Sequence, residues 1–256
     1  MATGYPKIFH DNRLDDATPA ASTTATGFNV LNLRDWRSSS WWKPTALPAT
    51  VTVDCGSAKA ADYCFVWGHD LFTHGCVFEV RGSTDNFAAS NVLVDTITPT
   101  SNDPFLLQFA SVSYRYWRLR ITTGATMPSL AIAAIGAALE VPAYFDEGFD
   151  PRGREAKGQY NRSQGGHPLG AVIEFQEWKD TLKFQLVNGG SGWTWIRDSF
   201  EPAWDAHLMH TAFGLAWDPD GHDTELMLLQ STGKFDSPHK SGMFCDLSLP
   251  VQGLVV

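Results

Sequence analysis

The chain has 256 residues and a formal net charge of −9, because 28 Asp and Glu outnumber 19 Lys and Arg. This length suits one large β domain or two ordinary domains, and a hydrophobic content of 43% excludes extended disorder. The negative charge repels phosphate backbones and anionic lipids, so neither nucleic-acid binding nor general membrane-surface binding is expected. With 22 Gly, 14 Pro and 12% aromatic residues, the composition favours strands and turns over helices.

The N-terminal sequence, MATGYPKIFHDNRLDD, lacks the basic start and apolar run of a signal peptide. No segment approaches 18 consecutive apolar residues, so no membrane insertion is expected. The four cysteines, Cys55, Cys64, Cys76 and Cys245, lack the paired spacing of a zinc site. They are expected to be reduced and buried after synthesis in a cytoplasm, and no metal or cofactor is expected.

Residues 1–26 are predicted to form an N-terminal arm, and residues 27–143 an antiparallel β-sandwich. Apolar and polar residues alternate in three of its segments, 50–54, 76–81 and 114–121. In the third segment Trp117, Leu119 and Ile121 share one face, which is predicted to face the core. Residues 130–139 fit either a buried strand or, because of their alanines, a helix.

Residues 144–165 are polar and rich in Gly, which predicts a linker or a long exposed loop. The remainder, 166–256, is predicted to be a smaller β-sandwich domain. Its expected strands are 171–175, 181–187, 213–217, 225–229 and 244–251. The first two flank residues 178–180 as a hairpin would, although the spacing of Phe175, Trp178 and Leu182 also fits a helix. The one predicted helical turn is 199–209, with Ser199 as its cap.

No motif in the sequence predicts an enzyme, since it contains no GxSxG, no HExxH, no Walker loop and no dinucleotide fingerprint. Asp205, His207 and His210 lie close together but lack further metal ligands, so hydrogen-bonded or surface histidines are the favoured interpretation. The acidic loop 218–225 offers oxygen ligands without the spacing of an EF-hand, which favours a plain turn. No carboxylate pair for glycoside hydrolysis can be nominated.

Two local features point to ligand binding. The adjacent Trp41 and Trp42 must point in different directions on an extended chain, and an exposed Trp near charged residues suits a sugar ring and its hydroxyls. In the loop 68–75, Asp70 and His74 form a second candidate pair, without a nucleophile to serve. The alternatives are that both tryptophans are structural, one closing the end of the sandwich, and that the loop is a plain connection.

Residues 27–141 resemble the discoidin-like domain, the coagulation factor 5/8 type C, galactose-binding-like jelly roll. The residues that carry the resemblance are Asn29–Asp35 followed by Trp41, Val51–Gly56, Phe78–Asn86, Tyr114–Ile121 and Ile132–Gly136. Cys55 replaces the usual Leu of an Asp-Leu-Gly motif, and Asn86 replaces the Gly of a Ser-x-Asp-Gly motif. The resemblance implies binding loops at one end of the barrel, which makes Trp41, Trp42, Asp70 and His74 the predicted ligand-binding residues.

The whole chain is similar in character to distal or minor tail proteins of long-tailed bacteriophages. That resemblance implies a structural virion protein of the tail tip or baseplate, assembled in the host cytoplasm as a homo-oligomeric ring beside the tube and hub proteins. The C-terminal domain would make the ring contacts, and the jelly roll would face outward to brace neighbours or contact a host surface glycan. The alternative is a free bacterial carbohydrate-binding, lectin-like protein without catalysis, for which Trp41 and Trp42 are the motivating residues.

Overall fold

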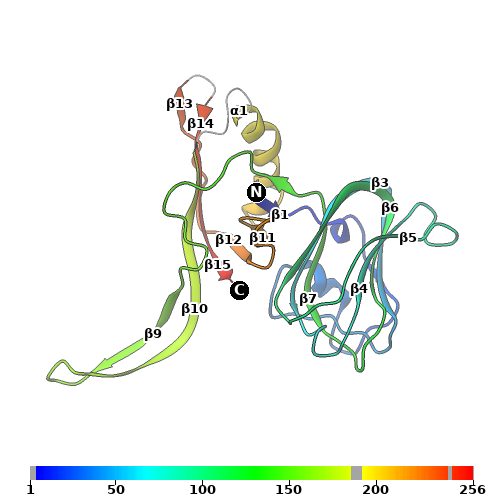
Figure 1. Ribbon diagram of the computed structural model, residues 1–256, viewed down its shortest axis with the longest axis horizontal. Coiled ribbons are helices and arrows are strands. Elements are labelled where there is room, and N and C mark those ends of the chain that lie inside the picture. The colour runs from blue at the N-terminus through cyan, green and yellow to red at the C-terminus, as the bar shows by residue number, and fades with distance from the viewer. Residues whose placement is uncertain (1–3, 186–191, 242–243, 256) are drawn as a thin grey trace.

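The computed structural model describes residues 4–185, 192–241 and 244–255, and two large antiparallel sheets dominate it (Figure 1). The strands are β1 (Lys7–Phe9), β2 (Ala20–Ala21), β3 (Ala49–His69), β4 (Phe78–Ser83), β5 (Val92–Ile97), β6 (Phe105–Ile121), β7 (Leu130–Gly136), β8 (Leu139–Glu140), β9 (Glu155–Arg162), β10 (Pro168–Phe184), β11 (Phe213–Ala216), β12 (Leu226–Ser231), β13 (His239–Ser241), β14 (Phe244–Cys245) and β15 (Leu247–Val255). Short helical turns are η1 (Arg13–Asp15) and η2 (Val30–Arg34), and one longer helical run joins α1 (Gly192–Trp195), η3 (Ile196–Phe200), α2 (Glu201–Ala203) and η4 (Trp204–Leu208). The predicted all-β class is confirmed.

The first sheet folds over itself into a two-layered jelly roll because its two longest strands bend. The first half of β3 and the second half of β6 form the outer layer with β2, β4 and β5, while their other halves form the inner layer with β7. The bend coincides with a shift in the β3–β6 register after Asp54. Gly56 lies in this stretch at φ +73°, a conformation that other residues rarely adopt.

The core of the jelly roll lies between these two layers. Val51 and Val53 reach it from β3, and Trp117, Leu119 and Ile121 reach it from β6, so the predicted core face of 114–121 is confirmed. Residues 130–136 form strand β7 rather than a helix. Every residue of β7 is buried because the jelly-roll core covers one face of the strand and the second domain covers the other.

The second sheet has seven strands in the order β8-β1-β11-β12-β15-β10-β9. Phe200 and Leu208, both within the predicted helical turn 199–209, pack on one of its faces, so a helical layer covers this side of the sheet. Its other face packs on the inner layer of the jelly roll, where Leu226 and Leu228 share a buried cluster with Phe65. The molecule is therefore built of four layers: helical run, second sheet, inner layer and outer layer.

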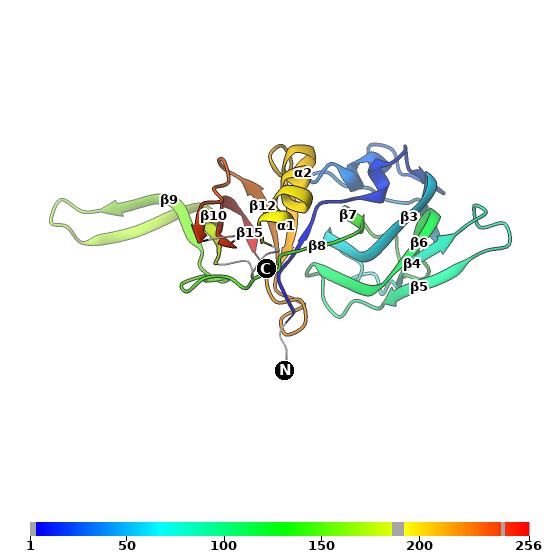
Figure 2. The same ribbon diagram turned by 90° about the horizontal axis from the view of Figure 1, so that it is seen from above.

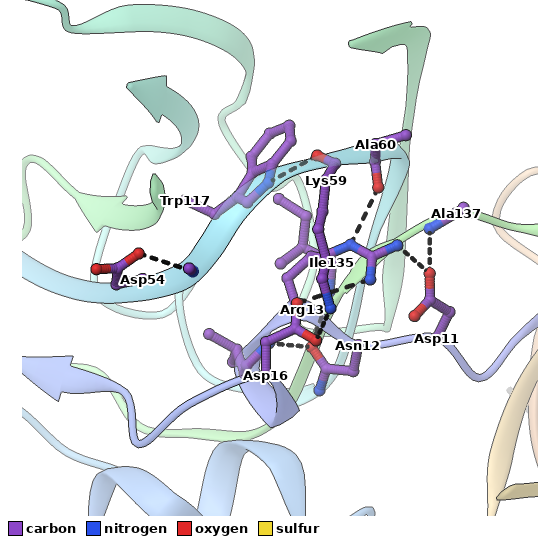
Figure 3. A network of polar contacts seen from close by, with 12 residues as sticks. Asp11, Asn12, Arg13, Asp16, Asp54, Lys59, Ala60, Trp117, Ile135 and Ala137 are labelled. Atoms are coloured by element: carbon purple, nitrogen blue, oxygen red, sulfur yellow. Dashed lines mark hydrogen bonds and ion pairs between the residues drawn. The ribbon is translucent and has the colours of Figure 1, made fainter. Parts of the chain in front are cut away.

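The N-terminal segment ties the two domains together. Strand β1 pairs with β11 in the second sheet, and the residues that follow it cross to the jelly roll. There the Arg13 side chain donates to the carbonyl of Ala60 at 3.0 Å and pairs with Asp11 (Figure 3). The Asn12 side chain bonds to β7, accepting from the N–H of Ile135 at 3.3 Å. The predicted N-terminal arm is thus a structural part of both sheets.

Three local predictions are corrected. The hairpin around residues 178–180 does not form, because β10 runs straight through it while Trp178, Leu182 and Phe184 all reach the core. The chain instead reverses near Gly166, at φ +83°, and the predicted loop 144–165 contains β9. The helical run begins at Gly192, so Ser199 lies inside it rather than at its cap. Residues 186 and 187 of the predicted strand lie outside the described residues.

Other predictions about the second domain are confirmed. Residues 213–217 and 225–229 correspond to β11 and β12, which form an antiparallel pair with Phe213 opposite Leu229.

All four cysteines are free thiols; Cys64, Cys76 and Cys245 are buried, while Cys55 is partly exposed. No helix in the described part of the chain has the length and apolarity needed to cross a membrane.

A two-stranded arm extends from the second sheet. It consists of β9 and residues 168–177 of β10, which pair with each other from Arg162–Pro168 to Glu155–Glu177. Beyond this point β10 pairs with β15 instead. In both overall views the arm projects away from the body, at the opposite end of the molecule from the jelly roll (Figures 1 and 2).

Candidate functional site

The adjacent tryptophans point to different sides of the chain, as an extended backbone requires. Trp42 is 2% exposed and belongs to the jelly-roll core, where its Nε1–H donates to the Thr24 hydroxyl at 3.2 Å. Its backbone also pairs with Leu130, which fixes it at the end of β7. Trp41 is half-buried and packs against the cluster between the two domains. The Trp42 ring is therefore packed in the core and has no exposed face for a sugar ring to stack on.

Asp70 and His74 hold two loops together. One Asp70 oxygen accepts the N–H of Ser129 at 2.6 Å, and the other lies 3.4 Å from Nε2 of His74. The Nδ1 atom of His74 contacts the Thr126 hydroxyl. Asp70 therefore lies near Trp42 in the fold, because Ser129 directly precedes Leu130, the residue that pairs with Trp42. These contacts brace this end of the barrel, while the Asp70 and His74 side chains stay partly exposed.

The weaker candidates have structural partners as well. Nε2 of His207 lies 2.9 Å from the carbonyl of Ala212, and the ring meets Trp36 edge-on in the boundary between the domains. In the acidic loop, Asp218 accepts the N–H of Gly221 at 3.1 Å and contacts His222 at 2.8 Å, as a turn between strands requires. The described residues contain no cluster of three or more metal-ligating side chains.

The outer face of the jelly roll contains a polar groove of about 430 Å³. It crosses β2, β3 and β6, and the loop after β4 forms one wall. Its lining combines hydroxyls, an amide, an aromatic ring and two charged groups, contributed by Thr18, Ala20, Ala21, Ser22, Thr50, Thr52, Asp54, Asn86, Tyr116 and Arg118. The strands place these side chains together because Thr52 is opposite Arg118 and Asp54 is opposite Tyr116 across the β3–β6 ladder.

Arg118 is held in a fixed orientation by the groove. Its Nε–H donates to the Thr52 hydroxyl at 2.9 Å, and its guanidinium carbon lies 3.6 Å from the centre of the Phe87 ring. Burial, followed by the charges of Arg120 and Arg81, lowers the pKa of Arg118 from its ordinary value. An arginine stays protonated at neutral pH, so this side chain places a partly desolvated cation in the groove.

Hydrogen bonds to Asp85 hold the wall that carries Asn86 and Phe87. Asp85 accepts the backbone N–H groups of Ala88, Ala89 and Ser90, and these hydrogen bonds, led by Ser90, lower its pKa. Asn86 and Phe87 themselves sit at φ +58° and +63°, a strained conformation that the surrounding hydrogen bonds hold in place. The groove therefore needs little rearrangement to receive a ligand.

Asp54 is the second charged side chain in the groove lining, beside Arg118. It accepts two hydrogen bonds from Arg115, both at 2.8 Å, and a third from the N–H of Gly56 at 2.8 Å. The Arg115 hydrogen bond is the main reason why the pKa of Asp54 falls to about 2. The Arg115 guanidinium also covers the Tyr116 ring at 4.9 Å.

The residues of this groove were not predicted as a site from the sequence. The alternation in 114–121 already put Tyr116, Arg118 and Arg120 on one face, and Thr50 and Thr52 alternate in the same way. The missing information was the register, which sets Thr52 against a residue 66 positions later.

No family model matches the chain, and no curated protein does. Among solved structures, it is similar to chitosan-binding module 1 of a chitosanase/glucanase from Paenibacillus sp. IK-5, with 19% identity over 49% of this chain and 98% of that one, at a TM-score of 0.43. It is also similar to a carbohydrate-binding module from Clostridium perfringens in complex with GalNAc-β-1,3-galactose, at 14% identity, 50% and 99% coverage and a TM-score of 0.43. A third is the carbohydrate-binding module of AlyQ in complex with 4,5-unsaturated mannuronic acid, at 23% identity, 46% and 93% coverage and a TM-score of 0.39.

These similarities extend over about half of this chain. The three solved structures are carbohydrate-binding modules, and the sugars named in their descriptions are reported for those modules.

Proposed function

We propose that this protein is a non-catalytic carbohydrate-binding protein whose ligand lies in the outer groove of the jelly roll. The lining of the groove carries the proposal. Threonine and serine hydroxyls, the Asn86 amide, the Asp54 carboxylate and the Arg118 guanidinium offer donors and acceptors to sugar hydroxyls, and Tyr116 offers an aromatic ring. Pre-formed concave surfaces with a few fixed polar groups are typical of small-molecule sites.

A glycan array with the full chain tests this proposal against the residues first predicted. Tyr116→Ala removes the ring from the groove, and we expect it to weaken binding about 5-fold, since an aromatic contact contributes ~1 kcal/mol. His74→Ala changes the end loop and is expected to leave binding unchanged. Binding lost in His74→Ala but kept in Tyr116→Ala would move the ligand to the end of the barrel. Wild-type protein that binds no glycan would contradict the proposal.

A second candidate function is a structural component of a bacteriophage tail tip or baseplate that assembles through its C-terminal domain. One observation favours assembly: the arm exposes five large apolar side chains, of which Tyr160, Leu169 and Val172 are more than 60% exposed and Ile173 and Phe175 about half. A two-stranded ribbon is only marginally stable alone in water, and its open edges invite pairing. Groove and arm lie on different domains, so the two functions are compatible.

A second copy of this chain is the partner that we propose for the arm. At the base of the arm an apolar groove of about 280 Å³ lies between Phe175, Leu228 and Leu254. The arm of one copy on the base groove of the next is a head-to-tail contact, which forms a ring when the rotation between copies closes and a filament when it does not. Eight residue pairs span about 26 Å, so each face of the arm offers on the order of 250 Å² and one arm contact buries on the order of 500 Å² in total. This is less than a standard interface, so the assembly depends on every subunit making two such contacts in a closed ring.

Light scattering over a concentration series tests this assembly. We expect a discrete multiple of 28.2 kDa for the wild-type chain and a monomer for Phe175→Ser. The control is Phe72→Ser, which removes a phenylalanine of similar exposure, 51%, from the jelly roll. A monomer at every concentration contradicts self-assembly through the arm. A gene position among tail genes would support the tail function, whereas a position beside sugar-uptake genes would favour a free carbohydrate-binding protein.

A further inference from the structure

The charges on the outer face of the jelly roll are unequally matched. β4 and the second half of β6 place Arg81, Arg118 and Arg120 on this face, with Glu79 as the acidic partner. Glu79 is shared, since it lies 2.7 Å from Nε of Arg81 and 3.3 Å from Arg120. Three guanidinium groups therefore face one carboxylate, in a protein whose net charge is −9.

Arg118 is the member of this group without a carboxylate. Among the described residues its one hydrogen bond is the donation from Nε to Thr52, which leaves the four N–H bonds of its two terminal nitrogens for a ligand. The stacking on Phe87 fixes the plane of the guanidinium. A planar, oriented guanidinium is the group that recognises carboxylate or sulfate oxygens in a two-pronged manner.

The acidic group in the groove does not offset this cation. Asp54 is already paired with Arg115 through two hydrogen bonds of 2.8 Å, so that pair is close to neutral as a unit. Arg120 and Arg81 are likewise engaged by Glu79. The uncompensated positive charge of the groove is therefore concentrated on Arg118.

We propose that the groove takes an anionic glycan, and that the Arg118 guanidinium receives the carboxylate or sulfate oxygens of that glycan. This inference rests on the proposed carbohydrate-binding function and adds the chemical class of the ligand. The surrounding hydroxyls of Thr50 and Thr52 and the Tyr116 ring would then hold the sugar itself. A charge on the ligand adds long-range attraction to this one face, against the repulsion of the whole molecule.

Isothermal titration with matched ligands separates charge from sugar shape. The probes are oligogalacturonate, the same oligomer as its methyl ester, a sulfated galactan, its desulfated form, and a glucosamine oligomer of opposite charge. We expect at least one anionic member to bind about 10-fold or more tighter than its neutral twin, because a hydrogen bond to a charged group is stronger than a neutral one. The two anionic series distinguish carboxylate from sulfate as the preferred oxyanion.

Two variants on the same strand test the residue. Arg118→Gln removes the charge at the proposed contact, and we expect affinity for the anionic glycan to fall about 10- to 100-fold. Arg120→Gln makes the same chemical change two residues away, where the guanidinium is already paired with Glu79, and is expected to have little effect. Arg118→Lys keeps the charge without the fork and should retain part of the affinity, which also guards against a misfolded Gln variant.

The possible failures are distinguishable. Equal losses in Arg118→Gln and Arg120→Gln would mean that general positive charge attracts the ligand, and would overturn the role of Arg118. Neutral and anionic twins that bind equally, with Arg118→Gln unchanged, would overturn the inference and leave carbohydrate binding standing. No binding to any probe or to a glycan array would overturn both.

Discussion

The boundary between the two domains is expected to behave as a core rather than as a contact of two independent units. Phe65 lies at its centre: the ring is 0% exposed and its centre lies 5.8 Å from that of Phe9, 6.1 Å from that of Trp67 and 6.2 Å from that of Trp36. Phe9 belongs to the second sheet, whereas Trp67 belongs to the jelly roll. Replacing Phe65 by Ala therefore removes a ring that both domains share.

The size of the effect follows from the packing. Phe→Ala substitutions in cores cost about 3–5 kcal/mol, and the value rises when neighbours cannot fill the cavity. Here the main chain of β11 lies against the ring: a Cβ on Gly214 would stand only 3.0 Å from its Cε2 atom. Because a sheet ladder holds that strand in place, collapse is limited and we expect a loss of about 4 kcal/mol.

Urea unfolding, followed by tryptophan fluorescence and far-ultraviolet circular dichroism, measures this loss. We expect one coincident transition for wild type, displaced as a whole in Phe65→Ala. Phe72→Ala is the matched control, because its ring is 51% exposed and its removal should cost less than about 0.5 kcal/mol. Two separate wild-type transitions, or a loss below about 1 kcal/mol in Phe65→Ala, would refute a shared core.

Two further predictions concern pH and close packing. Burial, followed by the charge of His207, lowers the pKa of His10 to about 4, whereas its unfolded value is near 6.5. The contribution of His10 to stability is therefore complete above pH 6.5. It is lost as the pH falls toward 4, by at most about 3 kcal/mol. His10→Gln should flatten this part of the pH–stability curve in urea titrations relative to wild type, and an unchanged slope would contradict the burial of a neutral imidazole. Asp15, whose pKa is raised to about 6, changes stability with pH in the opposite sense. Its side chain is 46% exposed and is present in both the wild type and the variant, so its effect cancels in the comparison. Gly136→Ala would place a Cβ 1.9 Å from the Asp11 carbonyl oxygen, and we expect thermal unfolding to show about 1–3 kcal/mol of destabilisation. The control is Gly233→Ala, whose nearest contact is at 3.4 Å and which should be neutral. Similar melting temperatures of the two variants would refute the close approach at Gly136.

Part of the fold could be read from the sequence because its signals are local. Alternation over residues 114–121 identified both the strand and the buried side of Trp117, and the turn formers around Asp85 marked the end of β4. The path of β10 could not be read in this way. Its 17 residues carry a register irregularity between Ile173 and Phe175, and the first half is exposed while the second is core, so no single periodicity describes it.

The site was harder to predict than the fold because it depends on pairing between distant strands. The tryptophan pair at residues 41 and 42 was the most unusual local feature, but only the structure shows that Trp42 fills the barrel. The groove instead requires that Thr52 meets Arg118, and that Phe87 lies against the same guanidinium. Neither contact leaves a trace in composition or spacing.

The location of a bound glycan decides whether the outer groove is the binding site. Hydrogen–deuterium exchange of the full chain, with and without the strongest ligand from the array, reports which backbone segments the ligand protects. If the glycan lies in the outer groove, we expect protection in residues 50–54, 83–90 and 116–120, around Arg118, with no change in 68–75. Protection confined to 68–75, around Asp70 and His74, would contradict the outer groove as the binding site.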